Sequence, residues 1–170
     1  MEQTQNTALL VIDMQEEILA TMPDETSVII ENTGKAITSA RYYNIPVIYV
    51  VAGKTHPATR NIDESMKVHP DLLPGNEEVT VMRRRVSAFT GTDLEIILRS
   101  FNIRNIVLTG ISTSGAILST LCEAADKGYG LTVLLDCCAD PDKEVHRIFM
   151  SKLFPCQAEV VTVDEWFNWW

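Results

Sequence analysis

The stretch IVLTGISTSGAILSTLCEAA, residues 106–125, decides the fold of this chain. It opens with aliphatic residues typical of a buried strand, and Ile117, Leu121 and Ala124 then recur at helical spacing. A turn of small residues, 110–116, joins the two parts. Backbone N–H groups at the start of a helix favour negative charge, so we expect this turn to hold an anionic group or a developing oxyanion.

Strands and helices alternate along the rest of the chain. The predicted strands are 7–13, 46–52, 78–83, 104–110, 131–136 and 159–163, and the predicted helices are 26–43, 93–101, 115–128 and 141–154. The strands are rich in Val, Ile and Leu with little polar alternation, which is typical of parallel strands buried on both faces. The pattern predicts a single α/β domain over residues 1–170. We expect it to be doubly wound and Rossmann-like, with six mainly parallel strands in the order 3-2-1-4-5-6 and helices on both faces.

Capping residues predict several helix ends. Thr92 with Glu95 three residues later has the spacing of a capping box. Asp140 before Pro141 predicts an N-cap with proline in the first helical position. Gly128 is expected to end the helix before it.

Length and charge limit the classes of function. The chain has 170 residues and a formal net charge of −9, which argues against nucleic acid and anionic membranes as partners. It has no apolar run near the roughly 20 residues that a membrane span needs, and no signal peptide is evident. The four cysteines lack CxxC spacing, so we expect small, buried, reduced thiols in a cytoplasmic protein. The adjacent Cys137 and Cys138 should point to opposite faces of a strand end.

A carboxylate ends the first predicted strand. Asp13 follows the buried run 8–12, and in a 3-2-1-4-5-6 sheet it would lie beside the 110–116 turn. Such a carboxylate suits general acid or base chemistry if burial raises its pKa. A cap for the local turn is the alternative.

Three stretches in this order resemble one enzyme family. They are 8–15, which ends in Asp-Met-Gln; 83–94, which reads RRRVSAFTGTDL; and the 110–116 turn. Together with Gly128-Tyr129 they resemble the isochorismatase-like hydrolases, also called cysteine hydrolases, from about residue 8 to about residue 166.

The resemblance implies three catalytic positions, two of which differ here. Typical members use an Asp, which matches Asp13, a Lys, where this chain has Arg83, and a Cys, where it has Ala116. Arginine stays protonated but can bind a carboxylate through two hydrogen bonds. An alanine cannot attack a carbonyl. A register shift of one or two residues would make Arg84 or Arg85 the inward residue instead.

The missing nucleophile changes the expected reaction. True isochorismatases resemble this chain in lacking the Cys, and they hydrolyse a vinyl ether with the Asp as acid. We therefore expect Asp-assisted, non-covalent hydrolysis of a small anionic molecule such as isochorismate, without a cofactor. One alternative is an inactive binding or assembly protein. Another is an amidase that uses Ser114 or Ser119, for which the sequence shows no base.

Further residues are expected to contact substrate. Gln15 lies on the same side of an extended chain as Asp13, where it would bind substrate or fix a loop. Phe89 would line the pocket or belong to the core. The family often has a cis peptide at the turn, here Ile111-Ser112, and the turn completes the predicted substrate contacts: Ile111, Ser112, Thr113, Ser114 and Gly115.

No metal site is expected. His56, Asp63 and His69 lack the clustered spacing of the metal site found in nicotinamidase-like relatives. His146 lies in a charged helical stretch and is predicted to be a surface residue.

Two segments remain outside this pattern. The Pro- and Gly-rich loop 53–77 is long enough to fold over the site as a lid, with a surface loop or an oligomer contact as alternatives. The aromatic tail 166–170 is predicted to pack across the subunit interface of a homo-oligomer, either a dimer or a tetramer.

Overall fold

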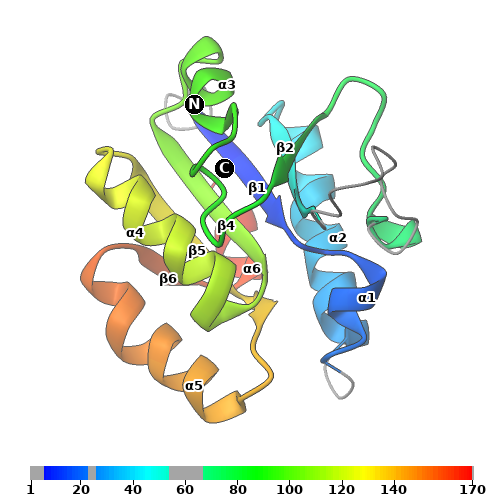
Figure 1. The fold of residues 1–170 in the computed structure, drawn as a ribbon, viewed down its shortest axis with the longest axis vertical. Helices are drawn as coiled ribbons and strands as arrows, with labels where there is room; N and C mark the ends of the chain where they lie inside the picture. The colour runs from blue at the N-terminus through cyan, green and yellow to red at the C-terminus, as the bar shows by residue number, and fades with distance from the viewer. Residues whose placement is uncertain (1–5, 23–25, 54–66, 170) are drawn as a thin grey trace.

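A computed structural model describes residues 6–22, 26–53 and 67–169 of the chain, and its centre is a six-stranded sheet (Figure 1). The strand order is β3-β2-β1-β4-β5-β6, and every neighbouring pair is parallel. The strands are β1 (Thr7–Ile12), β2 (Val47–Ala52), β3 (Val79–Arg83), β4 (Asn105–Ile111), β5 (Gly130–Ala139) and β6 (Glu159–Val161). The predicted fold class and strand order are confirmed.

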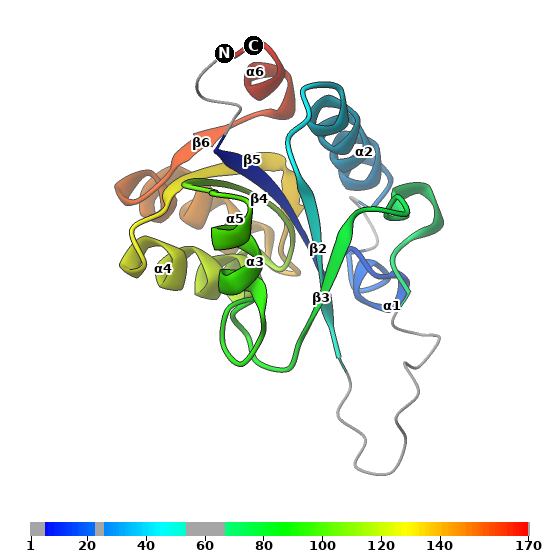
Figure 2. The same cartoon turned by 90° about the horizontal axis from the view of Figure 1, so that it is seen from above.

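Helices cover both faces of the sheet (Figure 2). On one face lie α3 (Leu94–Ser100), α4 (Leu118–Asp126) and α5 (Lys143–Ile148). On the other lie α1 (Glu16–Leu19), α2 (Thr26–Tyr42) and α6 (Val163–Phe167). Alternate residues of β1 enter different cores: Leu10 packs with the α3–α4 side, whereas Leu9 packs with the α2–α6 side. This double burial explains the aliphatic strands, because neither face of the sheet meets water.

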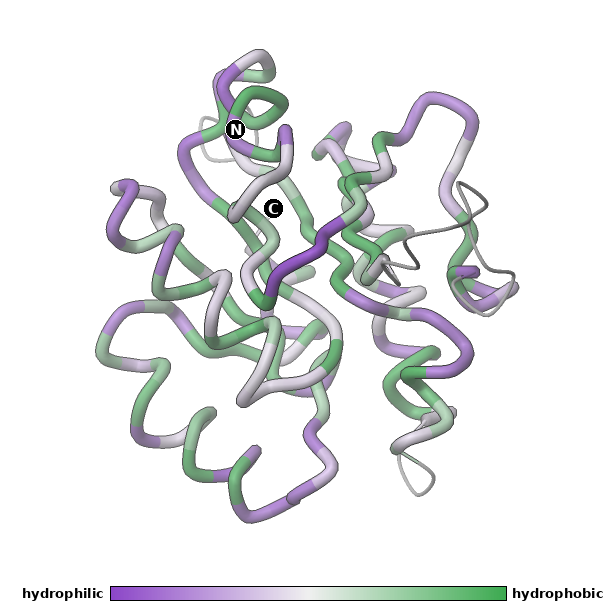
Figure 3. Tube along the Cα trace, in the orientation of Figure 1, coloured by the Kyte–Doolittle hydropathy of each residue, from purple (hydrophilic) through white to green (hydrophobic). Residues whose placement is uncertain are grey.

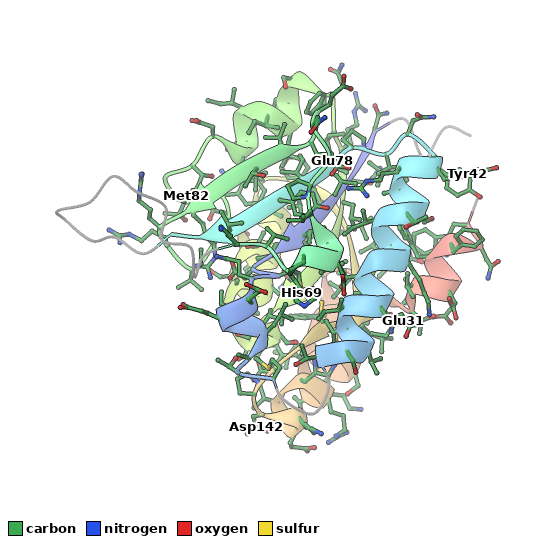
Figure 4. All side chains as sticks on the ribbon, turned by 90° about the vertical axis from the view of Figure 1, so that its right-hand side faces the viewer. Glu31, Tyr42, His69, Glu78, Met82 and Asp142 are labelled. Atoms are coloured by element: carbon green, nitrogen blue, oxygen red, sulfur yellow. The ribbon has the colours of Figure 1, made fainter. Side chains whose placement is uncertain are left out.

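Helix α2 runs along the outside of its layer, with Glu31 near one end and Tyr42 at the other (Figure 4). Its inner side is buried, whereas Tyr42 is strongly exposed. Arg41 forms an ion pair with Glu78 at 2.7 Å, which joins the end of α2 to the segment just before β3. Among the described residues, no helix has both the length and the apolar character needed to cross a bilayer.

Two predicted caps are wrong. Helix α3 begins at Leu94, and the Thr92 hydroxyl accepts from the Leu94 N–H while donating to the Ala88 carbonyl. Glu95 instead pairs with Arg99 on α3 and with Lys127, which directly follows α4. The cap of α5 is Asp142, whose carboxylate accepts from two N–H groups of the first turn, and not Asp140.

Two predicted helices include turns that are not α-helical. The predicted helix 115–128 begins with a π-helical turn at Thr113–Ile117 and continues as α4. Gly128 follows its end with φ +82°, as predicted. The predicted helix 141–154 divides into α5, a π-helical turn at Phe149–Leu153 and a 3₁₀ turn at Phe154–Cys156. The short α1, α6 and the 3₁₀ turn Pro70–Leu72 were not predicted.

The cysteines and the tail give mixed results. Cys137 and Cys138 are buried on opposite faces of β5, as expected. Cys122 and Cys156 are exposed, so the predicted burial of these two is wrong.

Trp166 is fully buried in the core of its own chain, which contradicts an intersubunit role for that residue. The exposed rings of Phe167 and Trp169 leave the interface a prediction. Most of the predicted lid, residues 54–66, lies outside the described residues, as do His56 and Asp63.

Candidate active site

The candidate site lies where the carboxyl ends of β1, β3, β4 and β5 meet. Register places Ile12 of β1 beside Gly110 of β4, so Asp13 follows β1 next to the strand that leads into the turn. Gly110 has φ +128°, and a Cβ there would collide with the Ile12 carbonyl. Glycine at this position therefore allows β4 to approach β1 closely at the entrance to the turn.

Asp13 is a buried carboxylate in an unusual backbone conformation. It is 1% exposed, and its φ of +56° is one that aspartate tolerates better than most residues. Its N–H continues the strand pairing by donating to the Val50 carbonyl at 2.8 Å. The neighbouring strand therefore fixes the position of the carboxyl group, which suits a reacting group better than a mobile surface side chain would.

Arg83 is the partner of Asp13 and extends from β3, two strands away. Its Nε donates to both Asp13 oxygens at 3.0 Å, and Nη2 donates to the same carboxylate. Nη1 donates to the Arg85 carbonyl at 2.7 Å, which holds the guanidinium in place. Arg84 and Arg85 have exposed side chains, so Arg83 is the inward residue of the three.

The Asp13–Arg83 pair has a defined electrostatic character. Burial raises the pKa of the Asp13 carboxyl above its usual value, while the hydrogen bond and the charge of Arg83 oppose that rise. Arg83 holds a fixed positive charge because arginine does not deprotonate in proteins. The pair thus combines a carboxyl group that holds a proton more readily than usual with a permanent cation.

The small-residue turn ends at Ala116. The Ile111–Ser112 peptide is cis, as the resemblance predicted. The methyl group of Ala116 is buried at 3% exposure and belongs to the same core cluster as Phe89 and Ile12. A methyl group cannot act as a nucleophile, so no covalent intermediate can form at this position.

The N–H groups of the turn are not all free, contrary to expectation. The Ser114 N–H donates to Asp140 Oδ2 at 2.8 Å, and the Ser114 hydroxyl donates to the same oxygen at 2.6 Å. The Gly115 N–H donates to the Ser112 carbonyl at 3.2 Å. The predicted surface residue His146 is half-buried, and its Nδ1 lies 2.8 Å from Thr113 Oγ1. The turn is therefore fastened to the end of β5 and to α5.

The predicted contacts Gln15 and Phe89 have structural partners. The Gln15 amide accepts from the Ala52 N–H at 2.7 Å and donates to the Ala52 carbonyl at 3.3 Å, which fits the loop-fixing alternative. Phe89 packs in the core with its ring 6.0 Å from that of Tyr129. Ile111 is buried against the opposite core.

The loop after β3 is clamped to α4. Glu123 accepts from the Ser87 hydroxyl at 2.6 Å and from the Thr90 hydroxyl at 2.9 Å. The Ala88 N–H donates to the buried Thr120 hydroxyl at 3.0 Å. These contacts join the loop that follows Arg83 to α4, the helix that follows the turn. Helix α4 therefore holds the positions of both the loop and the turn.

Sequence reasoning missed Asp140 and Glu123 as residues of this region. Asp140 directly follows β5, the same placement at a strand end that marked Asp13, and this signal was available in the sequence. Its position before Pro141 pointed instead to a helix cap. Among the described residues, no cluster of three or more His, Cys, Asp or Glu side chains is arranged to hold a metal ion.

Comparison with known proteins assigns the family. The model of the isochorismatase domain matches residues 7–165, so the chain belongs to the isochorismatase family of hydrolases. It is 32% identical to the isochorismatase family protein YecD of Escherichia coli O157:H7, over 95% of each chain. It is 30% identical to a probable inactive nicotinamidase of Arabidopsis thaliana, over 97% of this chain and 96% of the relative. An isochorismatase-like hydrolase from Alkaliphilus metalliredigens has a similar structure, with a TM-score of 0.89 at 25% identity, over 98% of this chain and 99% of that one.

Proposed function

We propose that this family member hydrolyses a small anionic molecule without a covalent intermediate, with Asp13 as the proton donor. The observation that carries the proposal is the buried Asp13–Arg83 pair in a site whose nucleophile position is occupied by Ala116. Because burial raises the pKa of Asp13, its carboxyl group can hold and deliver a proton more readily than an exposed aspartate.

A vinyl ether such as isochorismate fits this chemistry. Protonation of its vinyl carbon by Asp13 leaves a cation on the carbon bonded to the ether oxygen. Water then adds to that carbon to give a hemiketal. The hydroxyl proton of the hemiketal passes to the ether oxygen as the C–O bond breaks, which releases an alcohol and a ketone. Asp13 recovers its proton from the added water, so no step needs a nucleophilic side chain at position 116.

The test compares isochorismate with a panel of small amides. Asp13→Asn keeps the shape of the side chain and one acceptor for Arg83, yet it removes the transferable proton. We expect turnover of the ether to fall by about 100-fold or more, the range typical of a lost general acid. Asp93→Asn is the matched control, because Asp93 is an exposed carboxylate with no capping hydrogen bond at the start of α3. Full turnover by folded Asp13→Asn overturns the proposal.

A second candidate is a binding protein without catalysis. Ala116 favours it, and one relative is itself described as a probable inactive nicotinamidase. This candidate predicts that the wild type turns over none of these substrates. It also predicts that Asp13→Asn leaves the affinity for a small carboxylate ligand nearly unchanged.

A further inference from the structure

The carboxylate of Asp140 occupies the start of the helical turn. It is 6% exposed. Oδ2 accepts from both the N–H and the hydroxyl of Ser114, and Oδ1 accepts from the Asp142 N–H at 3.2 Å. Three donors from two segments thus hold the carboxylate in one orientation, so it is a fixed part of the turn and not a mobile surface charge.

This placement changes what the turn can bind. The start of a helix favours an anion because its N–H groups and its dipole present partial positive charge. Here a carboxylate of the protein itself takes that role, and within the described part of the chain no ion pair includes Asp140. A second anion at the turn would lie close to a carboxylate that already takes these donors, pairs with no cation of the described residues and is largely shielded from water, so the two would repel each other.

The opposite side of the site carries the reverse charge. Figure 3 shows a hydrophilic stretch beside the apolar central strands where β3 ends, and this part of the chain holds Arg83, Arg84 and Arg85. Asp13 takes up the Nε and Nη2 donors of Arg83, and Arg83 Nη1 holds the Arg85 carbonyl at 2.7 Å, so the exposed Arg84 and Arg85 follow directly at the rim of the site. The site therefore has a negative side at the turn and a positive side at the arginine loop.

We propose that Asp140 is a specificity-determining residue that keeps ionised groups of the substrate away from the turn. The substrate then presents an uncharged group to residues 112–116 and directs its anionic group toward Arg84 and Arg85. The proposal rests on the proposed function only in that the turn lines the substrate site. It narrows the substrate class to molecules that present an uncharged group to the turn while their anionic groups lie on the arginine side.

The test is an anion titration followed residue by residue. Isotope-labelled protein is titrated with sodium sulfate at constant ionic strength, and the amide signals of Ser114 and Arg85 are followed by NMR. In the wild type we expect saturable shifts at Arg85 and none at Ser114. Saturable binding of sulfate at Ser114 in the wild type overturns the proposal and requires no variant. Absence of saturable shifts at Arg85 overturns the proposal that the anionic group of the substrate binds at Arg84 and Arg85.

A charge-neutral variant sharpens the result. Asp140→Asn keeps an oxygen to accept from Ser114, and we expect sulfate to bind at the turn about tenfold more tightly than in the wild type. Asp142→Asn is the matched control, because this exposed cap lies two residues away, loses the same charge and remains a good cap as asparagine. An equal gain in both variants, or no gain in folded Asp140→Asn, refutes a local role. These shifts do not depend on turnover, so failure of the proposed hydrolysis would be seen separately.

Discussion

Replacing Arg83 with methionine should destabilise the protein by leaving a buried charge without a partner. The Asp13 side chain is 2% exposed and that of Arg83 is 17% exposed, and three donor–acceptor contacts join them. Removing one member of a buried pair costs about 3–5 kcal/mol. Because Arg83 keeps some contact with water, we expect Arg83→Met to lower the free energy of unfolding by about 3 kcal/mol at neutral pH.

The loss should depend on pH in a defined direction. Burial already raises the pKa of Asp13 and Arg83 opposes the rise, so removing Arg83 raises that pKa further. A carboxyl group whose pKa is higher in the folded than in the unfolded state contributes most stability at low pH. That contribution is lost as pH rises through the folded-state pKa. The deficit of Arg83→Met should therefore be smaller at about pH 4.5 than at about pH 7.5.

Urea unfolding followed by tryptophan fluorescence measures this effect, because Trp166 is fully buried in the folded state. The control is the double variant Asp13→Asn/Arg83→Met, which removes both charges and should recover to within about 1–2 kcal/mol of the wild type. A deficit below about 1 kcal/mol at neutral pH, or one that does not change with pH, would refute the reasoning.

Three further outcomes are expected. Gly110→Ala should lower the free energy of unfolding by more than about 3 kcal/mol, because the new Cβ would collide with the Ile12 carbonyl of β1. Gly91→Ala should cost only about 1–2 kcal/mol, because Gly91 has φ +70° but open space around it. Chemical denaturation of the two variants measures the difference. Burial raises the pKa of the Cys138 thiol to about 12 and that of Cys137 well above its usual value. Iodoacetamide should therefore modify Cys122 and Cys156 in native protein and leave Cys137 and Cys138 unmodified, and labelling of Cys137 or Cys138 in mass spectrometry would contradict this prediction. Trp166→Ala should cost about 3–5 kcal/mol even in dilute monomeric protein, and a loss that depends on protein concentration would restore an intersubunit role.

The sequence pattern was misleading at the start of α5, where a neighbouring residue is the helix cap. The Asp140–Pro141 pair suggested a helix cap, but Asp142 caps α5. The Asp140 carboxylate instead accepts a hydrogen bond from Ser114 in the turn after β4. The residues around Asp142 do not reveal this choice, because both aspartates can cap a helix. The relative position of β4 and β5 decides between them.

The sequence by itself predicted the order of the elements, the strand order and two positions of the expected catalytic set, Asp13 and Ala116, and it left the third open among Arg83, Arg84 and Arg85. These follow from local runs of aliphatic residues, from small residues at turns and from motifs whose members are neighbours in the chain. The confirmed cis peptide at Ile111–Ser112 belongs to this group, because the resemblance located it in one short motif.

Only the tertiary structure decided which side chains face each other across the site. Asp13 and Arg83 are 70 residues apart, and Ser114 and Asp140 are 26 residues apart. Three consecutive arginines have the same local pattern, and the register of β3 against β2 selects the first of them, since Ala52 pairs with Arg83. Contacts of this kind depend on how strands align and how chain ends project from the sheet, which no local pattern encodes.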